Sequence, residues 1–261
     1  MSTVIAFTGR RREPERRDVT ASLYPEMAAG GFSRVDPRVN FYTRVNALLR
    51  PDMTVVDLGA GRGCWADILS GYRRSLVNLK GKCRWVIGID PDPAVLRNPM
   101  VDEALVVAPG EALPLPDRSV DLIVAYAVLE HVEDPAQLAG EIRRVLRPGG
   151  WFCAWTPNKW GYVGVGARLV PSSLHARLLP VLSPHDRRQA EDVFPTFYRM
   201  NTLRQIQALF PVSDFENCSY LTDGPPSYNL GSSAVARLIQ LYGRLAPPGF
   251  AQLLHVFVRR R

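Results

Sequence analysis

Three glycines and two aspartates mark the part of the sequence whose residue types could bind a charged ligand. The stretch VVDLGAGRGCW places Gly59, Gly61 and Gly63 directly behind a run of apolar, β-branched residues. Glycine destabilises regular elements, so three at alternate positions indicate a loop where a ligand must come close to the backbone. Asp57 precedes this loop, and Asp90 ends the apolar segment RWVIGID.

The two acids decide which ligand suits the loop. The spacing GRGCWA also fits a relaxed dinucleotide pattern, but that pattern alone is weak evidence. A carboxylate at Asp57 would repel a pyrophosphate and attract an amine. Asp90 stands where it could accept hydrogen bonds from ribose hydroxyls. The glycine loop and the two acids therefore indicate a nucleoside with a positively charged side arm.

The elements that must position these residues alternate between strands and helices. Near-continuous apolar runs predict buried strands at 54–59, 84–90, 104–107, 120–128 and 151–155. Helices are expected at 64–79 and at 134–150, where Asp-Pro suits the helix start and Pro-Gly-Gly the end. Such alternation predicts a mostly parallel sheet with helices on both faces. The glycine loop would then lie at the carboxyl edge of the sheet, where ligands of these folds bind.

Four blocks of the sequence resemble the class I S-adenosylmethionine-dependent methyltransferases, in the broad small-molecule group called type 11. The blocks are VVDLGAGRG, VIGID, EALPLPDRSVDLIVAYAVLEHVEDP and EIRRVLRPGG, in this order over about residues 54–155. The resemblance implies a Rossmann-like sheet of seven strands, mostly parallel with an antiparallel last strand, and a helical insert after strand 5. DFENCSYL at 214–221 fits the sixth strand, and LLHVFVRR at 253–260 fits the last.

The resemblance also implies which residues bind the cofactor, S-adenosylmethionine, and its product, S-adenosylhomocysteine. These are Asp57, Gly59 and Gly61 at the methionine end, Asp90 at the ribose, Glu111 and Ala112 at the adenine, Ala125 and Tyr126 flanking the methionine, and Ala60 and Pro91 completing the set. The sequence departs from the family at one position. Relatives often carry an aspartate two residues before the glutamate of EALP, where Pro109 stands here. Adenine recognition must then use backbone groups or Glu111.

Methyl transfer itself asks little of the protein. The sulfonium already makes the methyl group electrophilic, so the main requirement is to align the acceptor with it. A hydroxyl acceptor also benefits from a general base. His131 and His185 are the predicted catalytic residues, with Asp186 as a further candidate, and His131 could equally be a hydrogen-bonded structural histidine. The sequence shows no zinc or magnesium constellation, so no metal is expected.

The segments outside the core would set the choice of acceptor. Residues 1–50 are interpreted as an N-terminal arm and a lid over the cofactor, and 51–261 as the methyltransferase domain with inserts at about 157–200 and 225–249. Aromatic and basic side chains of the first insert could bind the acceptor. They are Trp160, Tyr162, Phe197, Tyr198 and Arg199. The stretch 160–182 is either a cap that buries its own apolar face or a surface that meets lipid.

Missing motifs narrow the acceptor further. The fourth strand is followed by no Asn/Asp-Pro-Pro-aromatic motif, and no cysteine follows a proline, which disfavours methylation of base amines, glutamine amides and cytosine C5. No nucleic-acid-binding module is recognisable. The net charge of +7, with arginine runs at both ends, leaves open contact with an anionic partner such as a phospholipid surface, a phosphorylated substrate or RNA.

We therefore expect O-methylation of a glycan, glycolipid or secondary metabolite, because FPTFYRMNT resembles a stretch in enzymes of bacterial polysaccharide and glycolipid functions. C-methylation of an isoprenoid or quinone-like lipid is an alternative within enzymes. A non-catalytic protein that binds S-adenosylmethionine is an alternative of another class. The intact Asp57, Gly59, Gly61 and Asp90 argue against that last alternative.

The cellular compartment is predicted from the order of charged and apolar residues at the N-terminus and from the spacing of the cysteines. No apolar run reaches the roughly 18 residues of a membrane span, and the N-terminus places its charges after a short apolar stretch, the reverse of a signal peptide. The four cysteines lie far apart without a CxxC, so we expect reduced thiols. The sequence predicts a cytoplasmic protein, with peripheral membrane contact as an option, and leaves the oligomeric state open.

Overall fold

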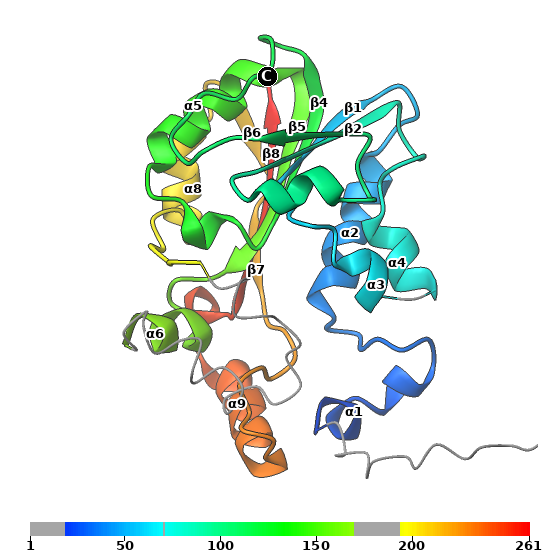
Figure 1. Ribbon diagram of the computed structural model, residues 1–261. Helices are drawn as coiled ribbons and strands as arrows, with labels where there is room; N and C mark the ends of the chain where they lie inside the picture. Colours follow the sequence, from blue (N-terminus) through cyan, green and yellow to red (C-terminus); the bar gives the residue numbers. More distant parts are fainter. Residues whose placement is uncertain (1–18, 70, 170–193) are drawn as a thin grey trace, which may run out of the picture.

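A mixed sheet forms the centre of the computed structural model, which describes residues 19–69, 71–169 and 194–261. The strand order is β3-β2-β1-β4-β5-β8-β6, with β7 also paired to β8 (Figure 1). The strands are β1 (Thr54–Leu58), β2 (Trp85–Asp90), β3 (Glu103–Val106), β4 (Val120–Tyr126), β5 (Leu146–Pro157), β6 (Phe215–Asn217), β7 (Tyr220–Thr222) and β8 (Leu253–Arg260).

The direction of the strands confirms the predicted class of sheet. β1 to β5 pair in parallel, whereas β8 runs antiparallel to β5, β6 and β7. β6 and β7 keep a single register against β8, because Asn217 lies opposite Val258 and Tyr220 opposite His255. They are one strand line interrupted at residues 218–219. The sheet therefore has the seven strand positions expected from the sequence.

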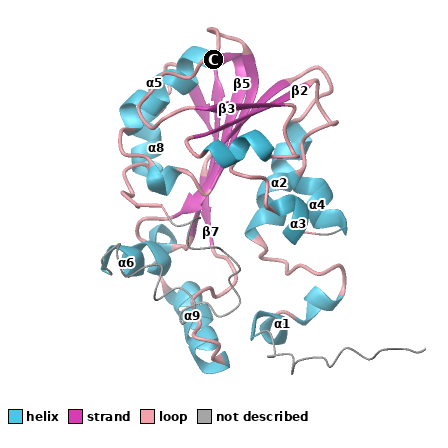
Figure 2. Ribbon diagram, in the orientation of Figure 1, coloured by secondary structure: helices cyan, strands magenta, loops and turns pink. Residues whose placement is uncertain are grey.

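Helices cover both faces of the sheet (Figure 2). On one face, α5 (Pro135–Val145) and α8 (Leu203–Leu209) bury Ile142 and Ile206 against the strands. On the other face, α2 (Pro37–Leu48), α3 (Trp65–Ile68) and α4 (Gly71–Val77) do the same with Phe41 and Leu76. Apolar side chains on both sides of each central strand are thus removed from water, which explains the near-continuous apolar runs.

Two predicted helices end differently in the structure. The helix expected at 64–79 is split, because Leu69 is extended and Gly71 has a φ of +54° between α3 and α4. The helix expected at 134–150 begins as predicted, with the Asp134 side chain capping it, but it ends at Val145. The next residue, Leu146, is buried and begins β5, so the RPGG motif belongs to the strand.

Three separated parts of the chain meet beyond the carboxyl edge of the parallel strands, in the lower part of Figure 1. They hold α1 (Val19–Leu23) with η1 (Pro25–Ala28), α6 (Tyr162–Leu169), and α9 (Ser233–Leu245) with η5 (Pro248–Phe250). α1 packs against α9. In the described part of the chain, no helix has both the length and the apolar character needed to cross a membrane.

At the opposite edge of the sheet, the Asp121 side chain links its own strand, β4, to β1 and β5. Its removal is therefore expected to lower the stability of the fold. Its carboxylate accepts hydrogen bonds from the Thr54 amide (2.8 Å) and from Arg147 through both oxygens (2.7 Å). We expect Asp121→Ala to lower the free energy of unfolding by about 1–3 kcal/mol, because the amide and the guanidinium lose their partner. Chemical denaturation measures this change.

Asp117 provides the matched control for that experiment. It also pairs with an arginine, Arg144, but its side chain is 74% exposed, against 15% for Asp121. We expect Asp117→Ala to cost no more than about 1 kcal/mol, because exposed ion pairs contribute little. Equal effects of the two changes would contradict the structural role given to Asp121.

Candidate active site

The glycine loop between β1 and α3 contains three glycines with three different environments. A Cβ on Gly59 would lie 2.3 Å from Val128 Cγ2, and one on Gly63 would lie 2.2 Å from Asn98 Oδ1. A Cβ on Gly61 would meet no atom within 4 Å. All three have positive φ. Packing within the protein therefore requires two of the glycines, and only the space beside Gly61 is open to a ligand.

The Asp90 carboxylate accepts two hydrogen bonds from backbone amides, one of them from the glycine loop. This uses about half of the hydrogen bonds that a carboxylate can accept. Its Oδ2 accepts from the Gly61 amide at 2.8 Å, and its Oδ1 accepts from the Asp92 amide at 2.9 Å. Burial raises the pKa of this carboxyl, and the two amide hydrogen bonds oppose that shift. A carboxylate offers about four lone-pair directions. Asp90 can therefore accept further hydrogen bonds from a ligand such as a ribose diol.

Asn98 positions the same loop from the other side, and sequence reasoning missed it. Its Nδ2 donates to the carbonyls of Ala60 (2.9 Å) and Gly61 (3.1 Å), while its Oδ1 accepts from the Met100 amide (2.8 Å). The side chain is buried. No local motif marks this residue, because its partners lie 37 and 38 positions away.

Asp57 lies on β1 next to Gly88 of β2 and Val124 of β4. Burial, and then the negative charge of Asp90, raises the pKa of its carboxyl to about 7. Among the described residues, none is recorded as a hydrogen-bond or ion-pair partner of this carboxylate. A carboxylate in this state gains stability from a cation placed beside it. A positively charged group placed beside Asp57 would therefore offset the cost of its buried charge.

Aromatic rings and an arginine form the wall of the site nearest α2. The Tyr126 ring stacks on Trp155 at a centroid distance of 4.5 Å and on Tyr42 at 5.8 Å. Arg38 lies with Cζ 3.8 Å from the centre of the Trp65 ring, and its Nε is buried without a hydrogen-bond partner among described residues. The sequence predicted a lid in this region but did not single out Arg38.

The surroundings of Tyr42 show that this aromatic wall lies beside Asp57. Burial, and then the charge of Asp57, raises the pKa of the Tyr42 hydroxyl, whereas the charge of Arg38 lowers it. A carboxylate and a guanidinium thus both act on a single side chain of α2. The arrangement could hold a ligand with both a positive and a negative end, such as the methionine part of S-adenosylmethionine.

The remaining predicted cofactor residues lie around this centre in different environments. Glu111 and Ala112 are exposed, and Glu111 Oε2 accepts from the Ala108 amide at 3.1 Å, closing its own turn. Pro91 is exposed at the end of β2, and Ala125 is fully buried near the end of β4. Ala125 could therefore contribute only backbone and packing to a bound ligand.

His131 lies in η3 (Leu129–His131), just after β4. Its Nδ1 is 2.6 Å from the Pro195 carbonyl oxygen. A carbonyl only accepts, so Nδ1 carries the proton, and in the neutral ring Nε2 keeps the lone pair. His131 can therefore act as a base through Nε2. His185, the other predicted catalytic histidine, lies outside the described residues, as does Asp186.

A network of hydrogen bonds between buried polar side chains supports η3. The Thr156 hydroxyl donates to Glu130 Oε2 at 2.8 Å, and Asn201 Nδ2 donates to Thr156 Oγ1 at 2.6 Å. The backbone carbonyl of Glu130 accepts from the Phe197 amide at 2.7 Å. The network joins the ends of β4 and β5 to the chain that returns from the insert. It therefore holds Glu130, the residue next to His131, in place.

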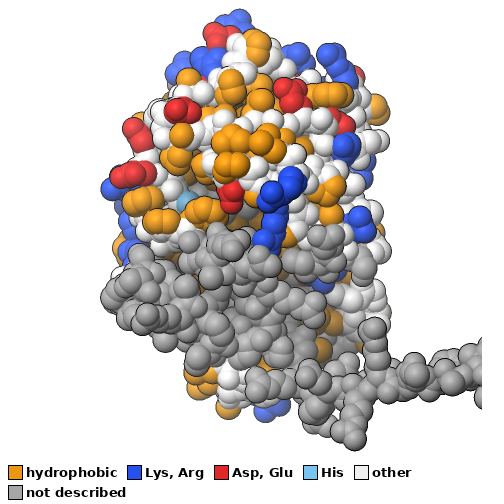
Figure 3. All heavy atoms as spheres, in the orientation of Figure 1, with side chains coloured by type: hydrophobic (Ala, Val, Ile, Leu, Met, Phe, Trp, Pro, Cys, Tyr) orange, Lys and Arg blue, Asp and Glu red, His pale blue; other side chains and the backbone are white. Residues whose placement is uncertain are grey.

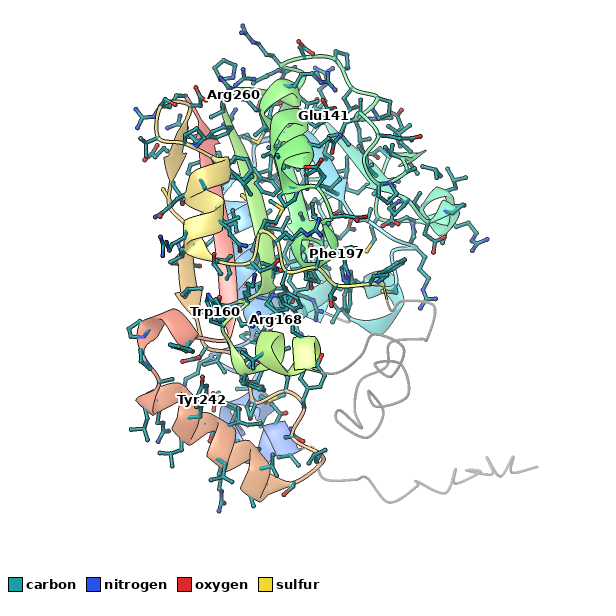
Figure 4. All side chains as sticks on the ribbon, turned by 90° about the vertical axis from the view of Figure 1, so that its left-hand side faces the viewer. Glu141, Trp160, Arg168, Phe197, Tyr242 and Arg260 are labelled. Carbon is teal, nitrogen blue, oxygen red and sulfur yellow. The ribbon has the colours of Figure 1, made fainter. Side chains whose placement is uncertain are left out.

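The returning chain carries three of the predicted acceptor residues. Phe197 has an exposed ring, whereas Tyr198 is buried. Arg199 lies over the Phe197 ring and its Nη1 donates to the Glu133 carbonyl. Figure 4 shows Phe197 well above Trp160 and Tyr242. The structure therefore places residues 197–199 together beside η3 and apart from the other predicted acceptor residues.

Trp160 and Tyr162 belong to a second group. Trp160 is half-exposed and lies 5.1 Å from the Arg168 guanidinium. Tyr162 lines a cavity of about 260 Å³ between α6, α9 and the N-terminal segment. Its hydroxyl donates to the Ser227 carbonyl at 2.8 Å and accepts from Gln252 Nε2 at 3.2 Å. Of the predicted acceptor residues, Tyr162 is the one that lines this cavity.

Residues 56–154 match the family model described as a methyltransferase domain. This segment is a class I methyltransferase domain. A probable S-adenosylmethionine-dependent methyltransferase of Mycolicibacterium smegmatis is 40% identical over 112 residues, which cover 40% of this chain and 38% of that protein. An uncharacterized methyltransferase of Mycolicibacterium gilvum is 30% identical over 150 residues, which cover 56% and 51%. The matched part thus spans between a third and about half of these relatives.

Solved structures extend the similarity of fold to most of the chain. A geranyl diphosphate C-methyltransferase from Streptomyces coelicolor, solved with Mg²⁺, geranyl diphosphate and S-adenosylhomocysteine, has a TM-score of 0.52 at 15% identity, covering 86% of this chain and 77% of that one. A chain in the complex of the Haloferax volcanii Trm112 activator with a putative methyltransferase has a TM-score of 0.51 at 18% identity, covering 94% and 98%. These identities establish the fold alone. Among the sequence relatives, the Mycolicibacterium smegmatis protein is described as S-adenosylmethionine-dependent.

The Asp57 carboxyl predicts a pH dependence of cofactor binding. Its pKa of about 7 in the free protein would fall when the cofactor's ammonium binds beside it, so binding releases a proton. We expect affinity for S-adenosylhomocysteine to rise with pH, by up to about tenfold per unit, until the pH reaches about 7. Calorimetry in buffers of different ionisation enthalpy measures both the affinity and the released proton.

The same shift has the opposite sign for stability. The folded protein holds the Asp57 proton more tightly than the unfolded chain, whose pKa is near 3.8. The free energy of unfolding without ligand should therefore fall as pH rises from about 4 to about 7. Asp57→Asn should remove the Asp57 contribution to this dependence and the pH dependence of affinity, while Asp52→Asn, at an exposed turn, should leave both. A pH-independent affinity in the wild type would contradict the assignment.

Proposed function

We propose that this protein is a methyltransferase that moves the methyl group of S-adenosylmethionine to a hydroxyl of a glycan, glycolipid or secondary metabolite. The observation that carries the proposal is the open space beside Gly61, bordered by the unpartnered Asp57 and the half-used Asp90. Two acids at this place suit an ammonium and a ribose diol. They do not suit the pyrophosphate of a dinucleotide.

In this proposal the methionine end of the cofactor lies between two opposite charges. Asp57 would bind its ammonium, and the Arg38 guanidinium, whose Nε has no hydrogen-bond partner among the described residues, would bind its carboxylate. The stacked rings of Tyr126 and Trp155 would lie near the sulfonium, which aromatic faces attract. Gly59, Ala60 and Gly61 would supply the close backbone; Pro91, Ala112 and Ala125 would shape the remaining walls, and Glu111 with the backbone of its turn would meet the adenine.

His131 is the proposed general base, with His185 kept as the second candidate from the sequence. The acceptor oxygen would form a bond to the methyl carbon as the carbon–sulfur bond breaks, leaving S-adenosylhomocysteine as a neutral thioether. The hydroxyl proton would pass to Nε2 of His131. The hydrogen bond from Nδ1 to the Pro195 carbonyl supports this role, because it orients the ring and leaves Nε2 to take the proton.

The acceptor would enter from the side of the accessory helices. Phe197 and Trp160 offer exposed aromatic faces for a sugar ring or a lipid chain. Arg199 would take an anionic group, and the Tyr162 cavity could hold a further part of the acceptor. The buried Tyr198 would act by holding this segment in place. We further propose that the protein works in the cytoplasm on a small-molecule, glycan or lipid acceptor, with a face that contacts a membrane.

Ligand binding tests the cofactor half of the proposal. We expect micromolar binding of S-adenosylhomocysteine by calorimetry and no comparable binding of NAD. Asp90→Ala should weaken S-adenosylhomocysteine binding at least about tenfold, because charge-assisted hydrogen bonds to the ribose are lost. Preference for NAD would overturn the proposal.

Asp102 gives a matched control for Asp90. Its side chain is also partly buried and accepts a hydrogen bond from the Val86 amide at 2.9 Å. Unlike Asp90, it directly precedes β3 and therefore lies at the amino edge of the sheet. Asp102→Ala should therefore reduce stability without changing the affinity for S-adenosylhomocysteine. An equal loss of affinity in both variants would mean that Asp90 acts only by supporting the fold.

Kinetics test the catalytic half. The acceptor is first identified by a mass gain of one methyl group in an extract incubated with the protein and labelled S-adenosylmethionine. His131→Asn keeps a donor for the Pro195 carbonyl but removes the base, so kcat should fall by about 10²–10⁴-fold while S-adenosylhomocysteine affinity is unchanged. An unchanged kcat would exclude His131 as the base, and a label found on carbon would exclude O-methylation.

A further inference from the structure

The helix α9 presents a line of leucines to solvent. Leu238, Leu241 and Leu245 are 65%, 50% and 75% exposed, and their spacing of three and four residues puts them on one face. Phe250 is also exposed, in the short helix that follows α9. Burying such side chains would lower the free energy of the protein in water. A contiguous stripe of this kind indicates an interaction surface.

The other face of α9 is held against the protein. Ile239 and Gly243 line the cavity that Tyr162 also lines, and Ala236 is fully buried. Asp223 lies on this inner side, because a Cβ on Gly243 would be 3.4 Å from its carboxylate. The helix is therefore docked by one face, and the leucine stripe points the opposite way.

The charge beside the stripe selects the partner. Arg237 and Arg244 are exposed along one edge of it, although Arg244 also lines the cavity, and residues 224–261 contain no aspartate or glutamate. An apolar stripe edged by arginines matches an anionic lipid surface, which offers hydrocarbon below and phosphate above. A two-fold contact between copies through α9 would instead bring the arginines of both chains into one interface.

We propose that α9 is the surface by which this protein docks onto an anionic membrane. The leucines would lie at the boundary between headgroups and acyl chains, with the arginine side chains extended toward lipid phosphates. In Figure 3, hydrophobic and basic side chains lie together at the lower end of the molecule, where Figure 1 places α9. This takes up the membrane contact proposed above and assigns it to a surface.

The position of α9 gives docking a consequence for the acceptor. The helix lies beyond the carboxyl edge of the sheet, and its inner face lines the cavity described above. A membrane in contact with the leucine stripe would therefore lie on the acceptor side of the molecule. A lipid-linked acceptor could reach the protein without leaving the bilayer.

Vesicle co-sedimentation of the full chain tests the inference. We expect binding to vesicles of equal parts phosphatidylglycerol and phosphatidylcholine, weakening as salt rises, and little binding to phosphatidylcholine alone. The triple variant Leu238→Ser, Leu241→Ser, Leu245→Ser should lower the partition coefficient at least about tenfold. The pair Arg237→Gln, Arg244→Gln should lower it for anionic vesicles and remove most of the salt dependence.

Exposed apolar residues elsewhere give the control. Leu96 and Val212 are 62% and 76% exposed on other elements, so Leu96→Ser with Val212→Ser should leave vesicle binding unchanged. Thermal melts should show all variants folded, because every substituted side chain is exposed. Absence of anionic-vesicle binding, equal binding by the triple variant, or a wild-type dimer that the triple variant converts to a monomer would overturn the inference. The test needs neither cofactor nor acceptor, so its failure would leave the proposed methyl transfer standing.

Discussion

Two carboxylates near the ends of adjacent strands, with no cationic side chain paired to either among the described residues, constrain the whole candidate site. Parallel pairing of β1 with β2 puts Asp57 opposite Gly88, two positions before Asp90. Backbone amides stabilise Asp90, whereas burial, and then the charge of Asp90, raises the pKa of Asp57 to about 7. The folded chain thus carries an electrostatic cost at this edge. A ligand with a positive group can offset that cost, and a ligand with a negative group there would add to it.

The glycine loop and its supports follow from the same constraint. The loop must bring the Gly61 amide to Asp90 and still leave space for a ligand. Asn98 holds two carbonyls of the loop, and its position in turn leaves room only for glycine at residue 63. Binding and folding therefore share the same few atoms.

The acceptor side of the site is formed by the segments that leave the sheet at its carboxyl edge. In a parallel sheet, every segment that follows a strand leaves from the carboxyl edge, so the insert after β5 begins beside the cofactor region. The N-terminal segment and the segment after β7 also end there, around the Tyr162 cavity. The matched family segment, residues 56–154, includes none of these parts. The matched segment is thus the core of the sheet, and the parts expected to distinguish acceptors lie outside it.

The sequence by itself determined the first five strands, the class of sheet and the residues proposed to bind the cofactor, because each depends on short-range pattern. The resemblance to class I methyltransferases implied a last strand at 253–260, the observed bounds of β8, and the loop with Asp57 and Asp90 was visible as a motif. Only the tertiary structure decided which glycine faces open space, that Asn98 and Arg38 belong to the site, and that the predicted acceptor residues form two groups. It also decided that the helix after residue 64 breaks and that the leucines of α9 face outward. These features arise from contacts between residues far apart in the chain, and the local periodicity of a sequence carries no record of such contacts.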